Sequence, residues 1–354
     1  LTISAIAFYV LFFSTQNAQT QTTWTPLDGP LLTPASKDVS ANDNNIIYGA
    51  DAPFIVKSTD GGENWHQTLY KIPSPIVLSV SPDNQLKVVA GQKVKNDVYK
   101  LLYTEDGFAT EPRNALVTET IKKPLRLVRS VNNSERVYLG ITYKSGKSSL
   151  RYSLDAGFSW ISVNYFRDDP ENPDDIATSV YDVATLKNGT GMDDKVLVAG
   201  YGGYGIQDGM WYTENFDEEE PTFTPITDIA VSGKDIISVA MRVELVSGIE
   251  KSRKFALGAN GNFYRNKFEN DLEPWEKLPD EQIPFYGYNA IKILALSNGN
   301  LVVASHGKGI FTSSDNGDNW SSLNGSGSGH TLRDLNVNAF SLDPSDEDEE
   351  RWYV

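Results

Sequence analysis

A Ser, an Asp, a Gly and a Trp recur together three times in this sequence, in the pattern Ser-x-Asp-x-Gly-x-x-Trp. The members of the three copies are Ser58, Asp60, Gly62 and Trp65; Ser153, Asp155, Gly157 and Trp160; and Ser313, Asp315, Gly317 and Trp320. This is the most enzyme-like text of the chain, but each residue type also has a role in a tight hairpin. The carboxylate can accept N–H bonds from the turn, the Gly can adopt a positive φ, and the Trp can begin the next strand. We therefore interpret the three copies as structural hairpins.

Aromatic residues gather in a Gly-rich stretch, residues 200–205, which Trp211 and Tyr212 follow. Tyr201, Tyr204 and Trp211 on a flexible backbone would form stacking platforms for sugar rings, which present apolar C–H faces. The same text also fits a tight turn with packed tyrosines. The three residues are candidate ligand-binding residues.

His306 is one of three histidines and lies in residues 304–310, Ala-Ser-His-Gly-Lys-Gly-Ile, on an expected turn between two inner strands. It is a fourth candidate ligand-binding residue, with a structural His bonded to neighbouring backbone as the alternative. His66 and His330 do not complete a metal-ligand spacing with it. We predict no metal site and no cofactor.

Acidic residues cluster in several expected loops, at 168–169, 174–175, 193–194, 217–220 and 346–350. None of these clusters has the spacing of an EF-hand, so solvated surface charge is the interpretation. A glycosidase would need two Asp or Glu facing each other across a cleft. Because the sequence does not show which acids face each other, it assigns no catalytic residue.

The repeated pattern resembles the Asp-box, or BNR repeat, of β-propellers such as sialidases, sortilin-like receptors and xyloglucan-cleaving glycosidases. Residues 304–310 are similar to a Thr-His-Gly-Arg-Gly segment of sortilin-like bacterial propellers, with Ser and Lys in place of Thr and Arg. The resemblance implies a fold more than a function, since the box occurs in enzymes and binding proteins alike. The chain lacks the Phe/Tyr-Arg-Ile-Pro segment of sialidases, and its length falls short of the double propeller of the xyloglucan-cleaving enzymes.

Short β segments separated by turn residues surround the boxes, and no helical period of useful length follows residue 19. Asp60 and Asp106 are 46 residues apart, and Asp106 and Asp155 are 49 apart, which is the spacing of four-stranded blades. In the box of the second unit we identify Asp106 and Gly107 as retained, and we place Asn266 at the box position of the fifth. We expect an all-β, seven-bladed propeller over residues 20–354, with six complete blades. The seventh would be shared between the C-terminus and a strand at 24–27.

The formal net charge is −16, from 47 acidic and 31 basic residues, so a nucleic-acid partner or an anionic lipid surface is not expected. Cysteine is absent. Residues 1–13 are apolar but too short to span a bilayer, so residues 1–19 are predicted to be a signal peptide that lacks its start. The sequence is expected to be a fragment, truncated at both ends, of a secreted protein.

Three functions remain open from the sequence. The first is a secreted, non-catalytic Asp-box propeller of the sortilin-like group, which binds an extracellular glycan or protein as part of a larger extracellular or cell-surface protein. The second is a glycoside hydrolase that acts on an extracellular polysaccharide through two carboxylates at the mouth of the propeller channel. The third is an assembly factor similar to the photosystem-associated Asp-box propellers, which share the boxes.

Overall fold

The computed structural model of the chain describes residues 36–41, 46–51, 54–95, 98–117, 123–130, 132–142, 149–163, 179–187, 194–201, 209–214, 216, 221, 223–228, 230–231, 234–268, 274–288, 290–325, 332, 335, 337, 339–342 and 352–353. The predicted signal peptide at 1–19 and the strand expected at 24–27 lie outside the described residues. Within these ranges the secondary structure is β-strand, with one 3₁₀ helix, η1 (Asp280–Gln282).

Six sheets follow one another along the described chain, and each is called a blade below. The first three blades contain β1 (Ser36–Ala41), β2 (Ile47–Asp51), β3 (Phe54–Ser58) and β4 (His66–Gln67); β5 (Pro75–Val80), β6 (Val88–Lys95), β7 (Val98–Thr104) and β8 (Arg113–Asn114); and β10 (Pro124–Arg129), β11 (Val137–Ile141), β12 (Leu150–Ser153) and β13 (Ser159–Ser162). The next three contain β14 (Val180–Lys187), β15 (Asp194–Gly200), β16 (Met210–Thr213) and β17 (Thr224–Pro225); β18 (Ile236–Val246), β19 (Ile249–Gly258), β20 (Phe263–Asn266) and β21 (Trp275–Lys277); and β22 (Ala290–Ala295), β23 (Leu301–Ser305), β24 (Gly309–Ser313) and β25 (Ser321–Ser322).

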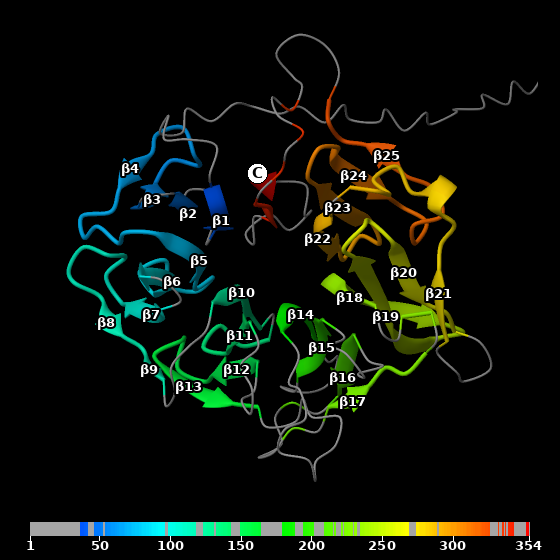
Figure 1. The fold of residues 1–354 in the computed structure, drawn as a ribbon, viewed down its shortest axis with the longest axis horizontal. Coiled ribbons are helices and arrows are strands. Elements are labelled where there is room, and N and C mark those ends of the chain that lie inside the picture. Colours follow the sequence, from blue (N-terminus) through cyan, green and yellow to red (C-terminus); the bar gives the residue numbers. More distant parts are fainter. Residues whose placement is uncertain are drawn as a thin grey trace, which may run out of the picture.

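Within each blade the four strands pair antiparallel in chain order. The blades are arranged around a ring, with the first strand of each blade facing the centre and the fourth strand at the periphery (Figure 1). The first strands of neighbouring blades contact each other in the order β1, β5, β10, β14, β18 and β22. A fifth strand, β9 (Leu116–Val117), leaves the second blade and pairs parallel to β13 on the outside of the third.

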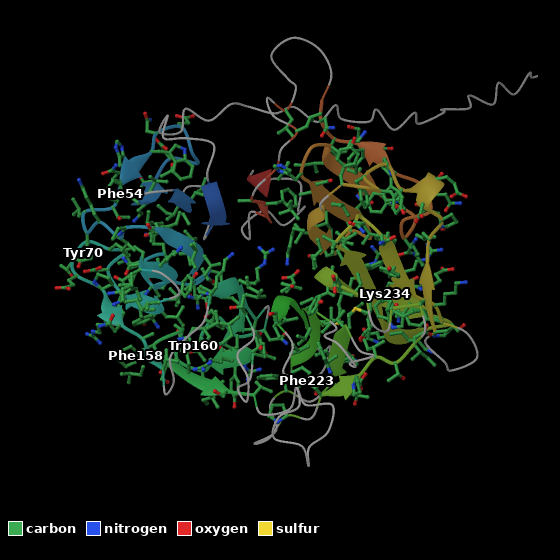
Figure 2. The ribbon with its side chains drawn as sticks, in the orientation of Figure 1. Phe54, Tyr70, Phe158, Trp160, Phe223 and Lys234 are labelled. Atoms are coloured by element: carbon green, nitrogen blue, oxygen red, sulfur yellow. The ribbon has the colours of Figure 1, made fainter. Side chains whose placement is uncertain are left out.

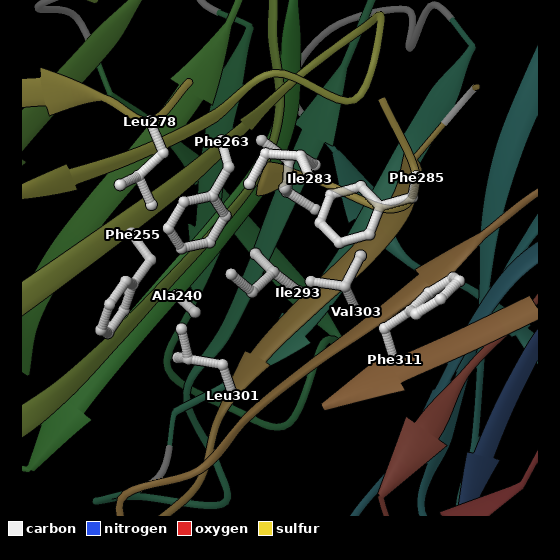
Figure 3. Packing of buried hydrophobic residues seen from close by; sticks show 11 residues of the cluster. Ala240, Phe255, Phe263, Leu278, Ile283, Phe285, Ile293, Leu301, Val303 and Phe311 are labelled. Atoms are coloured by element: carbon white, nitrogen blue, oxygen red, sulfur yellow. The ribbon is translucent and has the colours of Figure 1, made fainter. Parts of the chain in front are cut away.

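Apolar side chains cover both faces of the second strands. All five residues of β11 and all five of β23 are buried. A strand that is buried on both faces is expected where sheets are stacked face to face. The core therefore consists of separate clusters between consecutive blades. Figure 3 shows the cluster between the fifth and sixth blades, where Phe255 and Phe263 meet Leu301 and Phe311.

The ring contains a seventh, two-stranded sheet, β26 (Ser341–Leu342) and β27 (Trp352–Tyr353). β26 lies beside β1, and Phe340 packs on the apolar face of the sixth blade. Within the described residues, the predicted six complete blades and incomplete seventh are confirmed. The sequence pattern missed β1, however, because Ser36–Ala41 contains Lys, Asp and two Ser among six residues and carries no apolar alternation.

Candidate functional site

A one-residue irregularity near the start of each first strand marks an equivalent position in all six blades. The strand register shifts there in each case, and the residue that follows the shift is Asp38, Val77, Arg126, Asp182, Ser238 or Lys292. A β-bulge re-aims the side chains that follow it. Because the first strands surround the ring centre (Figure 1), these positions form one level around it.

Four of these residues, from the third to the sixth blade, meet in one polar group, which we call the central cluster: Arg126, Asp182, Ser238 and Lys292. Asp182 is 0 % exposed. Lys292 Nζ donates to both carboxylate oxygens of Asp182 at 2.8 Å, and Ser238 Oγ donates to Oδ2 at 2.6 Å. The Val239 backbone N–H also donates to Oδ2, at 3.2 Å. One carboxylate thus joins the fourth blade to the fifth and sixth.

Arg126 completes the central cluster from the third blade. Its Nε lies 3.4 Å from Asp182 Oδ1, and its side chain is 21 % exposed. Burial by itself raises the pKa of the Asp182 carboxyl, but the charges of Lys292 and Arg126 and the hydrogen bonds from Lys292 and Ser238 outweigh burial. The pKa therefore lies below its ordinary value, and Asp182 is held as a carboxylate.

The central cluster was missed from the sequence, although a signal for it exists. Arg126, Asp182 and Lys292 each stand between two apolar or aromatic neighbours in their strands, and an ion in such a position is normally paired. The spacing is also regular: Arg126 and Asp182 are 56 residues apart, Asp182 and Ser238 are 56 apart, and Ser238 and Lys292 are 54 apart. The period of the first strands therefore predicts that the four residues share a level.

Exposed tyrosines lie at the end of the blades where the first strands begin, which we call the entry end. Tyr201, Tyr286 and Tyr288 are 41 %, 41 % and 42 % exposed. The Tyr201 backbone N–H donates to Ser179 O, just before β14, and Tyr288 lies two residues before β22. Lys308 Nζ is 4.6 Å from the centre of the Tyr288 ring. Since the bulges are also at this end, the tyrosines and the central cluster share it.

Three of the four predicted ligand-binding residues, Tyr201, Trp211 and His306, lie in the described parts of the chain. Tyr201 and His306 are exposed, and both follow the end of a second strand at the entry end. The turn after His306 is fixed by Leu335 O, which accepts from Gly307 N at 2.8 Å. Trp211 is 5 % exposed and packs in the core between the third and fourth blades, so it presents no open face to a ligand. Tyr204 lies outside the described residues.

The three Ser-x-Asp-x-Gly-x-x-Trp segments, called box loops below, connect the third and fourth strands at the opposite end of the blades, the box end. In the second copy, Ser153 Oγ donates to Asp155 Oδ1 and accepts from Gly157 N, both at 2.8 Å. Asp155 also accepts from Ser159 N at 2.7 Å, and Trp160 Nε1 donates to Gly157 O at 2.9 Å. The first copy has the same bonds, and the third shares those of its Ser and Asp.

Two degenerate boxes were aligned incorrectly from the sequence. Thr104 and Asp106 keep the hydroxyl and the carboxylate, but the Gly position is held by Phe108, whose φ is 64°. Gly107 is one residue earlier. Asn266 ends β20 and therefore occupies the Ser position, where its side chain bonds Lys254 N at 2.7 Å and Ser252 O at 3.2 Å. The last residue of the third strand sets the alignment of the box. A degenerate loop sequence does not show where that strand ends, so its alignment can be wrong by one or two residues.

The carboxylates near the tyrosines differ in what they could do. Asp182 is engaged by hydrogen bonds on both oxygens and has a lowered pKa, so it is not a proton donor. Asp235 is exposed, directly precedes β18, and has a pKa that is raised by burial. Burial also raises the pKa of Tyr181, and the charges of Asp235 and Tyr201 add to that effect. Within the described ranges, no group of three or more His, Asp or Glu is arranged to hold a metal ion.

Comparisons with known proteins concern the fold. No family model and no curated protein sequence matches the chain. Among solved structures, it is similar to YCF48 from Cyanidioschyzon merolae, with a TM-score of 0.52 and 12% identity over 89% of this chain and 92% of that one. The WD40 β-propeller domain of Doa1 aligns with a TM-score of 0.54 and 12% identity over 87% and 86%. A GH74 xyloglucanase from Xanthomonas campestris aligns with a TM-score of 0.44 and 12% identity over 87% of this chain and 64% of that one.

The topology and these similarities agree on one class of fold. The chain is a β-propeller with six four-stranded blades and a two-stranded seventh sheet in the described residues. No helix in the described part of the chain has the length and apolar character that a membrane crossing requires.

Proposed function

We propose that this propeller is a secreted, non-catalytic glycan-binding module of the sortilin-like Asp-box group, within a larger extracellular or cell-surface protein. The single observation that carries the binding function is the set of three exposed tyrosines at the entry end, Tyr201, Tyr286 and Tyr288. Tyrosine rings offer apolar faces of fixed orientation to a ligand at a low entropic cost. The three box loops and the apolar residues 1–13 support the family and the secretion.

The state of Asp182 favours binding over hydrolysis. A retaining or inverting glycosidase needs two carboxylates facing the scissile bond, and one of them must be available as a nucleophile or base. Asp182, the carboxylate of the central cluster, has its oxygens occupied by Lys292, Ser238 and Val239. It therefore stabilises the ring and is not available for attack on a sugar.

Binding can be tested by calorimetric titration of the full chain with neutral and acidic oligosaccharides from extracellular polysaccharides. Tyr288→Ala is expected to weaken binding about tenfold, since it removes one aromatic contact and leaves the core intact. The matched control is Leu154→Ala, because Leu154 is 53 % exposed but lies in a box loop at the opposite end. Equal affinities of Tyr288→Ala, Leu154→Ala and wild type, or no glycan binding, would overturn the proposal.

A glycoside hydrolase is the second candidate, and Asp235 is the observation that favours it. The pKa of the Asp235 carboxyl is raised by burial, and its charge acts on Tyr181; a raised pKa is the direction that a general acid needs. The same oligosaccharides should be incubated with the protein and assayed for new reducing ends. Multiple turnovers that disappear in Asp235→Asn would establish the hydrolase and refute the non-catalytic module.

A further inference from the structure

Two cations of the central cluster, Arg126 and Lys292, contact the single carboxylate of Asp182. The carboxylate is already saturated by two contacts from Lys292, one from Ser238 and one from Val239. Asp182 therefore has little capacity left for the guanidinium of Arg126.

Arg126 is held only loosely within the described residues. Its Nε is buried, lies 3.4 Å from Asp182 Oδ1 and forms no hydrogen bond. Arg129, on the same strand β10, is the opposite case: its guanidinium donates to the backbone oxygens of Val80 and Ser134 at 2.9 Å and 2.6 Å. The strand thus carries one arginine that is used for structure and one, Arg126, whose Nε has no hydrogen-bond partner among the described residues.

We infer that the Arg126 guanidinium, at the entry-end level of the ring centre, binds a carboxylate of the ligand. Arginine presents parallel N–H donors that match the two oxygens of a carboxylate, and a partly buried pair of this kind is stronger than an exposed one. The chain as a whole carries −16, so this attraction for an anion is local.

The tyrosines indicate which class of ligand carries the carboxylate. Tyr201 and Tyr288 lie at the same end of the blades as Arg126, and aromatic faces at the same end as a guanidinium suit a sugar that carries its own carboxylate. The ligand class is therefore a uronic-acid-containing glycan. This inference rests on the glycan-binding function proposed above and specifies its substrate.

The test uses a galacturonic-acid trisaccharide and its methyl ester, which differ in charge and not in sugar. Calorimetric titration of the full chain in about 0.15 M salt limits the long-range repulsion. The acid is expected to bind about tenfold to a hundredfold more tightly than the ester. Arg126→Gln should abolish that difference, and Arg126→Lys should keep part of it. Arg113→Gln, at an outer-strand arginine that is 68% exposed, should leave it unchanged.

The outcomes separate the inference from the proposed function. Equal binding of acid and ester would overturn the inference and leave a glycan-binding module. Absence of binding by both, and by neutral oligosaccharides, would remove the glycan-binding function itself. If a peptide binds through its free C-terminal carboxylate and its amide does not bind, Arg126 would still be a carboxylate-binding residue, but the uronic-acid ligand would be refuted. If Arg126→Gln does not fold, the acid–ester difference in wild type and in Arg126→Lys still decides.

Discussion

Aspartates are stabilised in two different ways in this molecule, in the box loops and in the central cluster. Asp155 is bound by groups within five residues of itself, and the same bonds recur in the other box loops. Asp182 is bound by residues from other blades, and the cluster occurs once in the described chain. The repeated arrangement builds the fold, whereas the position that changes from blade to blade is where a specific function can be placed.

The largest expected effect follows from removal of the Asp182 carboxylate. Asp182→Ala leaves Arg126 and Lys292 without their counter-ion inside the ring and should lower the free energy of unfolding by about 3–5 kcal/mol. Urea unfolding measures this loss. A loss below about 1 kcal/mol would show that the central cluster does not hold the blades together.

The Asp182 carboxylate also makes a contribution to stability that is lost in acid. The pKa of Asp182 is below its ordinary value in the folded protein, so its contribution is present above the unfolded pKa of about 3.9 and is lost as the pH falls through the folded value. The stability difference between wild type and Asp182→Asn should therefore be constant from about pH 7 to 5 and shrink below about pH 4. A difference that grows on acidification would contradict the lowered pKa.

The next effect concerns the box Gly. Gly157 has a φ of 104°, and an added Cβ would overlap the Val89 side chain of the preceding blade. Gly157→Ala should therefore cost about 2–4 kcal/mol, from backbone strain and overpacking together. Gly299→Ala is the control, since φ is 93° but no atom lies near the added Cβ. It should cost only about 1–2 kcal/mol, and equal costs in urea unfolding would rule out the packing effect.

A smaller loss is expected from the box Ser. Ser153 is 0 % exposed, and its hydroxyl bonds both Asp155 and the buried N–H of Gly157. Ser153→Ala should cost about 1–3 kcal/mol because the N–H loses its acceptor. Ser58→Ala and Ser313→Ala remove the same bonds. If the three losses in thermal or urea unfolding differ by more than twofold, the box loops are not equivalent.

The smallest effect belongs to an exposed carboxylate. The backbone N–H and the side chain of Asn64, together with Ser58, lower the pKa of Asp60 to about 2. The sign is the same as for Asp182, so Asp60 stabilises the fold above about pH 4 and loses that contribution between about pH 4 and 2. Asp60→Asn should shift the acid unfolding midpoint only slightly, and a shift as large as that of Asp182→Asn would reverse the ranking of the two regions.

The parts of the fold that depend on local bonds could be predicted from the sequence. The bonds of Asp60 and Asp155 lie within a few residues, so the box text alone determines the hairpin and, through its spacing, the blades. Asp182 could not be understood in this way, because Lys292 lies 110 residues further along the chain. Trp211 shows the same limit: its residue type suits a ligand platform, but the packing of neighbouring blades decides that it is buried.

The short strand β9 links the order of folding to the order of the chain. Leu116 N donates to Phe158 O at 2.7 Å, so the segment that leaves the second blade completes the outer edge of the third. During synthesis the two residues of β9, Leu116 and Val117, emerge before β13, and they have no strand partner until β13 forms. The outer edge of the third blade is therefore completed by a segment that comes from the end of the second, which ties the two blades together.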